Sequence, residues 1–252
     1  MIFNIQFFLS LSKHFDLINF LCMIFSLLLC YFSVKIPLKP QKISFSNPLY
    51  NYPVQNQTIS GFYLNIMIRF CSTLYIFLVF FISYFLKTYF KQFQFFSALW
   101  SLFTSINLSL FSASCFKSLV GRPRPDMYHY CGFNSTYESC QYKEKDKEFI
   151  SWPSYHAASA MSCCLFLSLF TRAIIKSNYL FISLFSYSFI FLGIYIGATR
   201  IQDNKHHPDD VTAGLFIGAI TTFFIWDQAQ KSIFPQHAQN FDISSEDSLL
   251  EN

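Results

Sequence analysis

The chain is poor in charged residues. Asp, Glu, Lys and Arg make up 13% of its 252 residues, whereas hydrophobic residues make up 53%. Soluble domains carry about 25% charged residues, so this chain has too little polar surface to cover a water-soluble globule. It also lacks a long basic run and a basic–aromatic stacking pattern, which argues against nucleic acid as a partner. The composition predicts a membrane protein.

Two further absences limit the architecture. The sequence has no internal repeat and no glycine-rich hinge among its seven glycines, so we expect one domain. The opening stretch "MIFNIQFFLSLS" has no basic region before it and no small-residue cleavage site after it, so it is not predicted to be a cleaved signal. It is too short to span a membrane, and we interpret it as an interfacial helix.

Six uncharged apolar stretches are present, and a membrane helix needs about 20 such residues. They predict an all-α fold: a polytopic membrane protein with six transmembrane helices in a bundle and the active site at one membrane face. The helices are expected near residues 17–34, 66–86, 95–116, 154–172, 178–198 and 209–226, within one domain over residues 1–226. The polar tail, residues 227–252, is expected to be disordered.

Most of the chemically interesting residues belong to two loops. The loops after helices one, three and five must lie on one side of the membrane, because each crossing changes sides. Parity therefore brings together the following residues: Lys117, Arg124, Ser154, His156, Arg200, His206 and Asp210.

Three of these residues are cations at the membrane boundary: Lys117, Arg124 and Arg200. Unpaired charges there are costly, and few carboxylates accompany them at matching positions. An anionic ligand is the natural partner, since arginine suits forked recognition of phosphate oxygens. Pro123 and Pro125 keep their loop out of a helix. The alternative is an interfacial anchor whose basic side chains merely snorkel.

Two stretches resemble helix starts. In "PSYHAASA", Ser154 is a good N-cap, and the free amides of a helix N-terminus suit phosphate; the alternative is a capping serine beside an idle His156. In "HHPDDVTAG", Pro208 fits the first helical position. A nearby carboxylate fixes the tautomer of an imidazole, so Asp210 would make His206 a nucleophile or base.

The second stretch also permits a metal site. The residues of a metal-ligating type there are Asp203, His206, His207, Asp209 and Asp210. The neighbouring cations would repel a divalent metal, so we favour covalent histidine chemistry and expect no metal.

Three motifs carry a family resemblance: K-x6-R-P (Lys117 to Pro125), P-S-x-H (Pro153 to His156) and R-x5-H-x3-D (Arg200 to Asp210). Together they resemble the type 2 phosphatidic acid phosphatase family. "GRPRPD" and "TRIQDNKHHPDDVTAG" look like its lipid phosphate phosphatase branch, and the likeness covers roughly residues 60–225.

The resemblance implies a metal-independent, cofactor-free phosphatase that hydrolyses phosphatidate-like lipid phosphate monoesters through a phosphohistidine. His206 would attack phosphorus, Asp210 would orient His206, and His156 would protonate the leaving alcohol. The implied phosphate ligands are Lys117, Arg124, Ser154 and Arg200.

The chain departs from the family pattern at two positions. Thr199 stands where serine is usual and keeps a hydroxyl. Tyr155 stands where glycine is usual and adds a ring beside the catalytic histidine. Two alternatives therefore stay open: a polyisoprenyl-diphosphate phosphatase of the same chemistry, or a catalytically impaired lipid-phosphate-binding protein. A transporter fits less well, because its charges should lie mid-membrane.

Cysteines and sequons suggest the orientation. Cys131 and Cys140 flank Asn134 in "NST", and Asn56 in "NQT" lies on the same side. A hypothetical Cys131–Cys140 disulfide and these two glycosylation acceptors predict an oxidising, lumenal or extracellular face in an endomembrane or plasma membrane. The basic residues do not decide the orientation, and the sequence does not indicate an oligomeric state.

Overall fold

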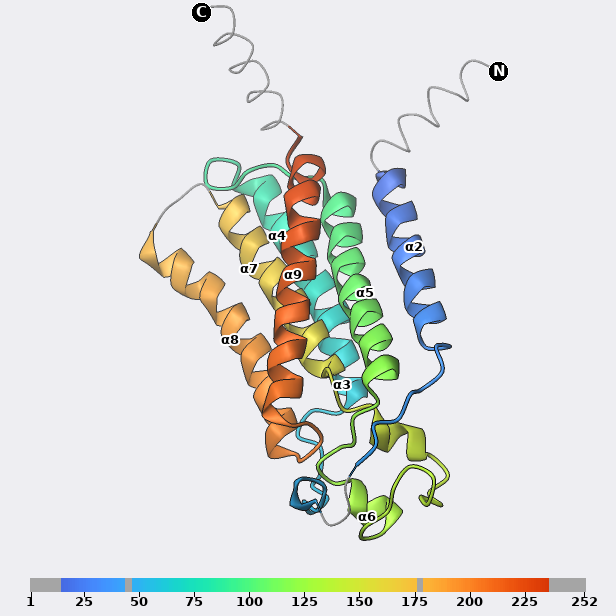
Figure 1. Cartoon of the computed structure of the whole chain (residues 1–252). Helices are drawn as coiled ribbons and strands as arrows, with labels where there is room; N and C mark the ends of the chain where they lie inside the picture. The colour runs from blue at the N-terminus through green and yellow to red at the C-terminus, as the bar shows by residue number, and fades with distance from the viewer. Residues whose placement is uncertain (1–14, 44–46, 176–178, 236–252) are drawn as a thin grey trace, which may run out of the picture.

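The structure is a computed structural model that describes residues 15–43, 47–175 and 179–235. Apart from an isolated bridge between Phe90 and Ile175, the regular elements in these ranges are helical. The α-helices are α2 (Leu17–Ser33), α3 (Gly61–Asn65), α4 (Ser72–Phe85), α5 (Phe95–Val120), α6 (Met127–Cys131), α7 (Tyr155–Ile174), α8 (Leu180–Gln202) and α9 (Pro208–Ile233) (Figure 1). A π-helical turn, Ile66–Cys71, joins α3 to α4, and short 3₁₀ turns lie at Pro48–Tyr50 and Lys145–Phe149. The predicted all-α fold is confirmed.

In the part of the chain that the structure describes, five helices are long and apolar enough to cross a membrane: Gly61–Phe85, Phe95–Val120, Tyr155–Ile174, Leu180–Gln202 and Pro208–Ile233. Helix α2 is also apolar but has 17 residues, at the lower limit of about 17–25 for a span. The count of six spans therefore stays a prediction. Large apolar side chains such as Phe181 and Phe216 are exposed on the outer faces, as expected of surfaces that contact lipid tails.

The helices extend further than the apolar stretches predict. Helix α5 continues past Lys117 to Val120, and α8 continues past Arg200 to Gln202. The prediction that the polar tail starts at residue 227 is wrong for residues 227–233, which form the end of α9. Its alanine, glutamine and lysine residues are good helix formers, and the polar side chains of Gln228, Gln230 and Lys231 are exposed at the helix end. Residues 236–252 and the opening apolar stretch lie outside the described residues.

The connections follow the alternation that parity predicts. The α2–α3, α5–α7 and α8–α9 connections lie at one end of the bundle, which we call the site end (Figure 1). The α4–α5 connection lies at the opposite end. Candidate residues from three distant parts of the chain therefore meet at the site end.

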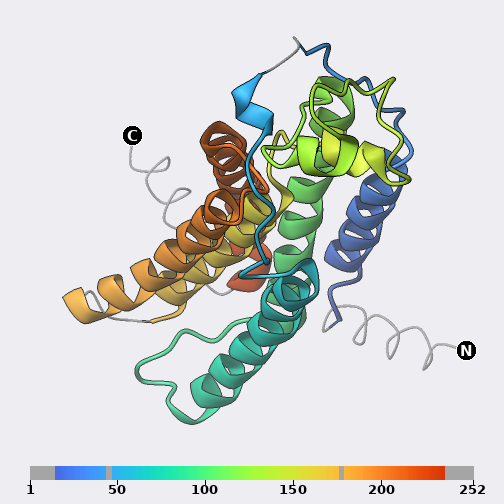
Figure 2. The same cartoon turned by 90° about the horizontal axis from the view of Figure 1, so that it is seen from below.

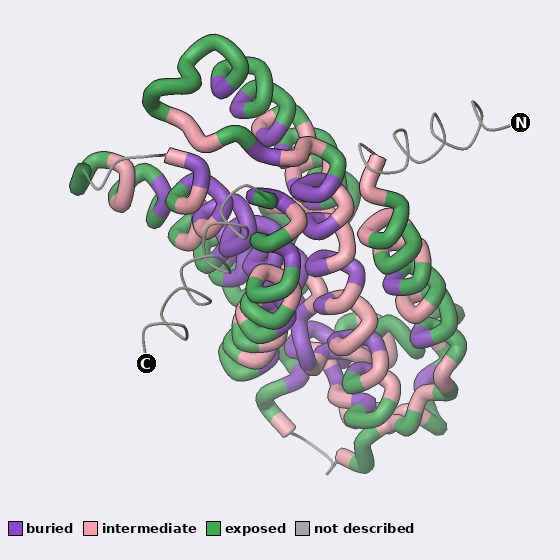
Figure 3. Tube along the Cα trace, turned by 90° about the horizontal axis from the view of Figure 1, so that it is seen from above, coloured by how far each residue is buried: buried purple, intermediate pink, exposed green. Residues whose placement is uncertain are grey.

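Helix α7 is the central element, and most of its side chains are buried among α5, α8 and α9 (Figure 3). Two glycines of α9 allow close approach to it. A Cβ added to Gly214 would lie 2.5 Å from the Ser154 carbonyl oxygen, and one added to Gly218 would lie 2.3 Å from that of Ala158. Small residues let membrane helices pack backbone to backbone. The starts of α7 and α9 are thereby joined, and the Ser154 N–H donates to the Asp210 carbonyl at 2.9 Å.

Candidate active site

His206 and Asp210 lie at the start of α9 with Ser151 beside them. Asp210 Oδ2 accepts hydrogen bonds from Ser151 Oγ at 2.5 Å and from the His207 N–H at 2.8 Å. His206 Nδ1 lies 3.4 Å from Ser151 Oγ and 3.6 Å from Asp210 Oδ2. Because 3.6 Å is long for a direct hydrogen bond, the serine hydroxyl bridges the imidazole and the carboxylate.

This bridge determines the tautomer of the histidine. Ser151 donates its only proton to Asp210, so its oxygen is left to accept the Nδ1–H of His206. The lone pair of the His206 ring then lies on Nε2. The Asp210 carboxylate orients His206 mainly through Ser151, a residue that the sequence analysis did not single out.

Burial lowers the pKa of His206 well below its usual value. The negative charge of Asp210 opposes this shift, and the charges of Lys117 and Arg124 lower the pKa further. The imidazole is therefore neutral at physiological pH. A neutral imidazole with a free Nε2 lone pair can act as a nucleophile.

His156 lies in the first turn of α7. Ser154 caps this turn, since its Oγ accepts the Ala157 N–H at 3.4 Å. His156 Nε2 is buried and has no hydrogen-bond partner among the described residues. A buried polar atom without a partner costs about 1–3 kcal/mol, so this nitrogen is well suited to meet a ligand.

Lys117 lies close to the start of α7, because its ammonium is 4.7 Å from the ring centroid of Tyr155, the residue before His156. Lys117 lies in the last turn of α5 and donates to the carbonyls of Ile150 and Ser151. Because the Ser151 hydroxyl lies next to His206 Nδ1, Lys117 is near both histidines.

Arg124 is held by backbone. Its Nε donates to the Lys147 carbonyl at 2.7 Å, and its own N–H donates to the Glu148 carbonyl at 2.8 Å. Within the described ranges, neither Lys117 nor Arg124 forms an ion pair with a carboxylate. Both cations therefore keep charge available for an anion.

Arg200 departs from the expectation that few carboxylates accompany the cations. Its Nη1 pairs with Asp203 Oδ2 at 3.0 Å, and both side chains are buried. The expectation was wrong here because residues three apart at a helix end lie side by side. Arg200 Nε is buried without a partner in the described part of the chain.

Arg122 is a second residue that the sequence analysis did not assign. Its Nη1 bonds both Asp209 and Asp210, with 2.7 Å to Asp210 Oδ1. Arg122 was not singled out because the family motif K-x6-R-P, counted from Lys117, fits Arg124 and not Arg122.

The carboxylates of the alternative metal cluster are engaged by arginines, Asp203 by Arg200 and Asp209 by Arg122. No group of three or more metal-ligating side chains forms within residues 15–43, 47–175 and 179–235.

Tyr155 stacks beside the site. The Lys117 ammonium lies 4.7 Å from the centroid of its ring, a cation–π distance. The residue that departs from the family pattern therefore contacts one of the predicted phosphate ligands.

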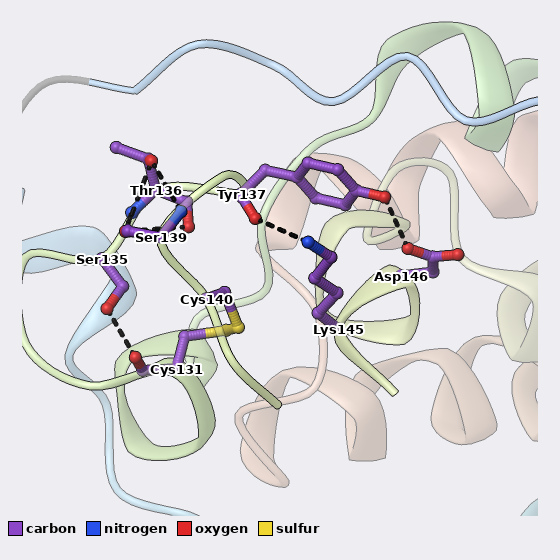
Figure 4. Close-up of a disulfide and its surroundings, with 8 residues drawn as sticks. All are labelled: Cys131, Ser135, Thr136, Tyr137, Ser139, Cys140, Lys145 and Asp146. Carbon is purple, nitrogen blue, oxygen red and sulfur yellow. Dashed lines mark hydrogen bonds between the residues drawn. A yellow bond between two sulfur atoms is a disulfide. The ribbon is translucent and has the colours of Figure 1, made fainter. Parts of the chain in front are cut away.

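The cysteine loop lies at the same end of the bundle. Cys131 and Cys140 form a disulfide, which is the pairing predicted (Figure 4). In this loop, Lys145 Nζ donates to the Tyr137 carbonyl at 3.1 Å. Asn134 is half-buried here and Asn56 is exposed in the α2–α3 connection; their glycosylation stays a prediction.

Comparisons with known proteins indicate the family of the chain. The model of the family described as "PAP2 superfamily" matches residues 98–234. Phospholipid phosphatase 1 of Rattus norvegicus is 27% identical over 146 residues, which cover 50% of this chain and 52% of the rat protein. Phospholipid phosphatase 2 of Rattus norvegicus is 31% identical over 117 residues, covering 41% of this chain and 42% of that protein.

A third relative, phospholipid phosphatase-related protein type 4 of Rattus norvegicus, is 33% identical over 103 residues, covering 40% of this chain and 12% of that protein. The chain spans about half the length of phospholipid phosphatase 1. No solved structure matches the chain.

Proposed function

The chain belongs to the PAP2 superfamily, and we propose that it is a metal-independent phosphatase that hydrolyses lipid phosphate monoesters through a phosphohistidine intermediate. One observation carries this proposal: at the site end of the bundle, Lys117 donates to the carbonyl of Ser151, whose hydroxyl lies between His206 and Asp210. In this proposal His206 is the nucleophile, His156 is the acid, and Lys117 belongs to the set that binds the phosphate group.

The chemistry proceeds in two displacements. In the first, the Nε2 lone pair of His206 attacks phosphorus, the bond from phosphorus to the lipid oxygen breaks, and His156 gives its proton to that oxygen. In the second, His156 takes a proton from water, the water oxygen attacks phosphorus, and the phosphorus–nitrogen bond breaks. Free phosphate leaves and His206 is restored.

The cations supply the charge stabilisation that a metal ion gives in other phosphoryl-transfer sites. Lys117, Arg124 and Arg200 would neutralise the charge on the phosphate oxygens in the transition state. Backbone amides in the first turn of α7, which Ser154 opens, add donors of a kind that binds phosphate.

An apolar groove between α5 and α9 supports a lipid as the substrate. Its volume is about 360 Å³, and its lining residues are Ser112, Phe116, Trp152, Ala213, Phe216, Ile217, Ile220 and Thr221. Phe116 precedes Lys117, and Trp152 lies two residues before Ser154. A lipid chain in this groove would place its phosphate at the cations.

The decisive experiment uses purified protein, phosphatidate labelled with ³²P and EDTA. We expect phosphate release in the presence of the chelator and an acid-labile label on the protein, both lost in His206→Ala. His129→Ala is the matched control, because His129 is exposed on α6 at the same end of the bundle. Activity that requires added divalent metal, or that survives in His206→Ala, would refute the proposal.

The lipid substrate has its own test. Ala213→Phe should fill the groove and raise KM for long-chain phosphatidate about tenfold, since each buried methylene contributes about 0.8 kcal/mol. Hydrolysis of a soluble aryl phosphate should not change. Cys22→Phe is the matched control, because Cys22 lines a separate groove of about 420 Å³ between α2 and α5. An equal loss with both substrates would contradict the assignment.

A second candidate function is a lipid-phosphate-binding protein of impaired turnover. The observation that favours it is the contact between Tyr155 and the Lys117 ammonium. Tyr155→Gly decides between the two functions. If the parent protein is inactive and this variant restores activity, impaired turnover is supported; Tyr155→Phe is the control that keeps the ring.

Parallel assays with phosphatidate and a polyisoprenyl diphosphate decide the substrate.

A further inference from the structure

An extended segment of the α2–α3 connection, residues 50–59, crosses the site end of the bundle (Figure 2). We call it the strap. The Tyr52 N–H donates to the Pro125 carbonyl at 3.0 Å, and Asn204 Nδ2 donates to the Pro53 carbonyl at 2.9 Å. The strap therefore contacts the loops that precede both α6 and α9, although it lies outside residues 98–234, which match the family model.

The end of the strap holds the Arg200–Asp203 pair. Thr58 donates twice to the Asp203 carboxylate, from its N–H to Oδ2 at 3.0 Å and from its hydroxyl to Oδ1 at 2.7 Å. Arg200 Nη1 donates to the Ile59 carbonyl at 3.0 Å as well as to Asp203, and Nη2 lies 3.5 Å from Gln57 Oε1.

These contacts fix the orientation of the Arg200 guanidinium through its terminal nitrogens, Nη1 and Nη2. Arg200 and Asp203 are each 2% exposed, so the pair is shielded from water, and both oxygens of Asp203 are occupied. Arg200 Nε has no partner among the described residues. The contacts with the strap and Asp203 engage the terminal nitrogens, so the guanidinium keeps Nε for a phosphate oxygen.

We propose that Thr58 and Asp203 are positioning residues that hold the Arg200 guanidinium in its phosphate-binding orientation, and that the strap is thereby part of the catalytic centre. This inference rests on the proposed function. The physical reason is preorganisation: a donor that is already oriented needs no rearrangement as charge develops on the phosphate, and small misplacements can cost about 100-fold in rate.

Thr58→Val tests the proposal, because it removes the hydroxyl and keeps the shape of the side chain. We expect kcat for phosphatidate to fall about tenfold, with KM changed less than twofold and the midpoint of thermal unfolding lowered only by the few degrees that one lost hydrogen bond costs. Thr58→Ser should restore the rate. Thr104→Val is the matched control: it removes a hydroxyl that bonds only within α5, to the Trp100 carbonyl.

A double-mutant cycle separates positioning from a structural role. In an Arg200→Ala background, Thr58→Val should have no further effect on kcat, since coupled residues are not additive. A rate loss that persists in that background, or a lowered unfolding midpoint that accounts for it, would overturn the proposal. Asp203→Asn should behave as Thr58→Val does, with a larger loss.

The two proposals fail in different ways. If the parent protein hydrolyses phosphatidate and Thr58→Val matches it, the strap proposal alone is wrong. If the parent protein hydrolyses no phosphate ester, the proposed function is wrong. Orthovanadate binding, measured by calorimetry, then tests the strap proposal. The same affinity in Thr58→Val as in the parent would overturn the positioning role, and about tenfold weaker binding would support it.

Discussion

The two histidines of the site have opposite surroundings. His206 is buried, and its Nδ1 faces Ser151 and Asp210, so one side of the ring is fully engaged. His156 has a buried Nε2 with no partner in the described part of the chain. A nucleophile must be held in one tautomer, whereas a general acid must leave a nitrogen open to the substrate. The difference in partners thus matches the difference in proposed roles.

The largest effect should come from His206. His206→Asn should lower kcat by at least about 10⁴-fold, because removing the nucleophile of a catalytic unit abolishes nearly all covalent catalysis. Rapid quench with ³²P-phosphatidate should show no phosphoenzyme. A phosphoenzyme in this variant would place the nucleophile elsewhere and break the comparison.

Removing the proposed general acid, His156, should lower the rate less than removing His206, and the size of this loss should depend on the substrate. His156→Asn should slow phosphatidate hydrolysis about 10²–10⁴-fold, the usual contribution of general acid–base catalysis. An aryl phosphate needs less help from an acid, because its leaving group is more stable as an anion, so phosphoenzyme formation from it should be largely spared. Equal losses with both substrates would show that His156 is not the acid.

Ser151 sharpens the contrast between the histidines. Ser151→Ala removes the bridge to Asp210 and should lower kcat about 10–100-fold, because a small misplacement of a reacting group can cost about 100-fold in rate. Ser151→Thr keeps the hydroxyl and should lose less. If Ser151→Ala retains the full rate in stopped-flow assays, Asp210 must orient His206 without it.

The smallest effect is on thermal stability. It concerns two carboxyl groups that, like the two histidines, differ in whether they have hydrogen-bond partners. Asp210 is fully partnered, whereas Glu148 Oε2 is buried without a partner among the described residues. Burial raises the pKa of Glu148 to about 7, against the opposing charge of Arg124. A carboxyl with a raised folded-state pKa contributes no penalty below its unfolded value, and the penalty grows from there up to about pH 7.

Glu148→Gln should therefore unfold at the same temperature as the parent protein at pH 4 and about 2–4 °C higher at pH 8. Differential scanning fluorimetry in detergent measures this difference. A variant that is less stable at pH 8 would show that the ionised Glu148 is favourably paired with Arg124.

Part of this organisation could be predicted from residue order alone. The length of the apolar stretches predicts helices, and each crossing reverses direction, so Lys117, His156 and His206 had to reach the same end of the bundle. Motif spacing selected Arg124 and Asp210. The partners in the site could not be predicted in this way: Arg122 and Asp210 are 88 positions apart, and Thr58 and Asp203 are 145 apart.

Apolar length, alternation and local motifs by themselves determined the helical membrane fold and the residues that gather at one end. Only the tertiary structure decided which carboxylate holds which cation, that Ser151 stands between His206 and Asp210, and that the strap reaches Arg200. The physical reason is that such contacts depend on how the helices are rotated against one another. Close backbone packing at Gly214 and Gly218 sets that rotation for α7 and α9.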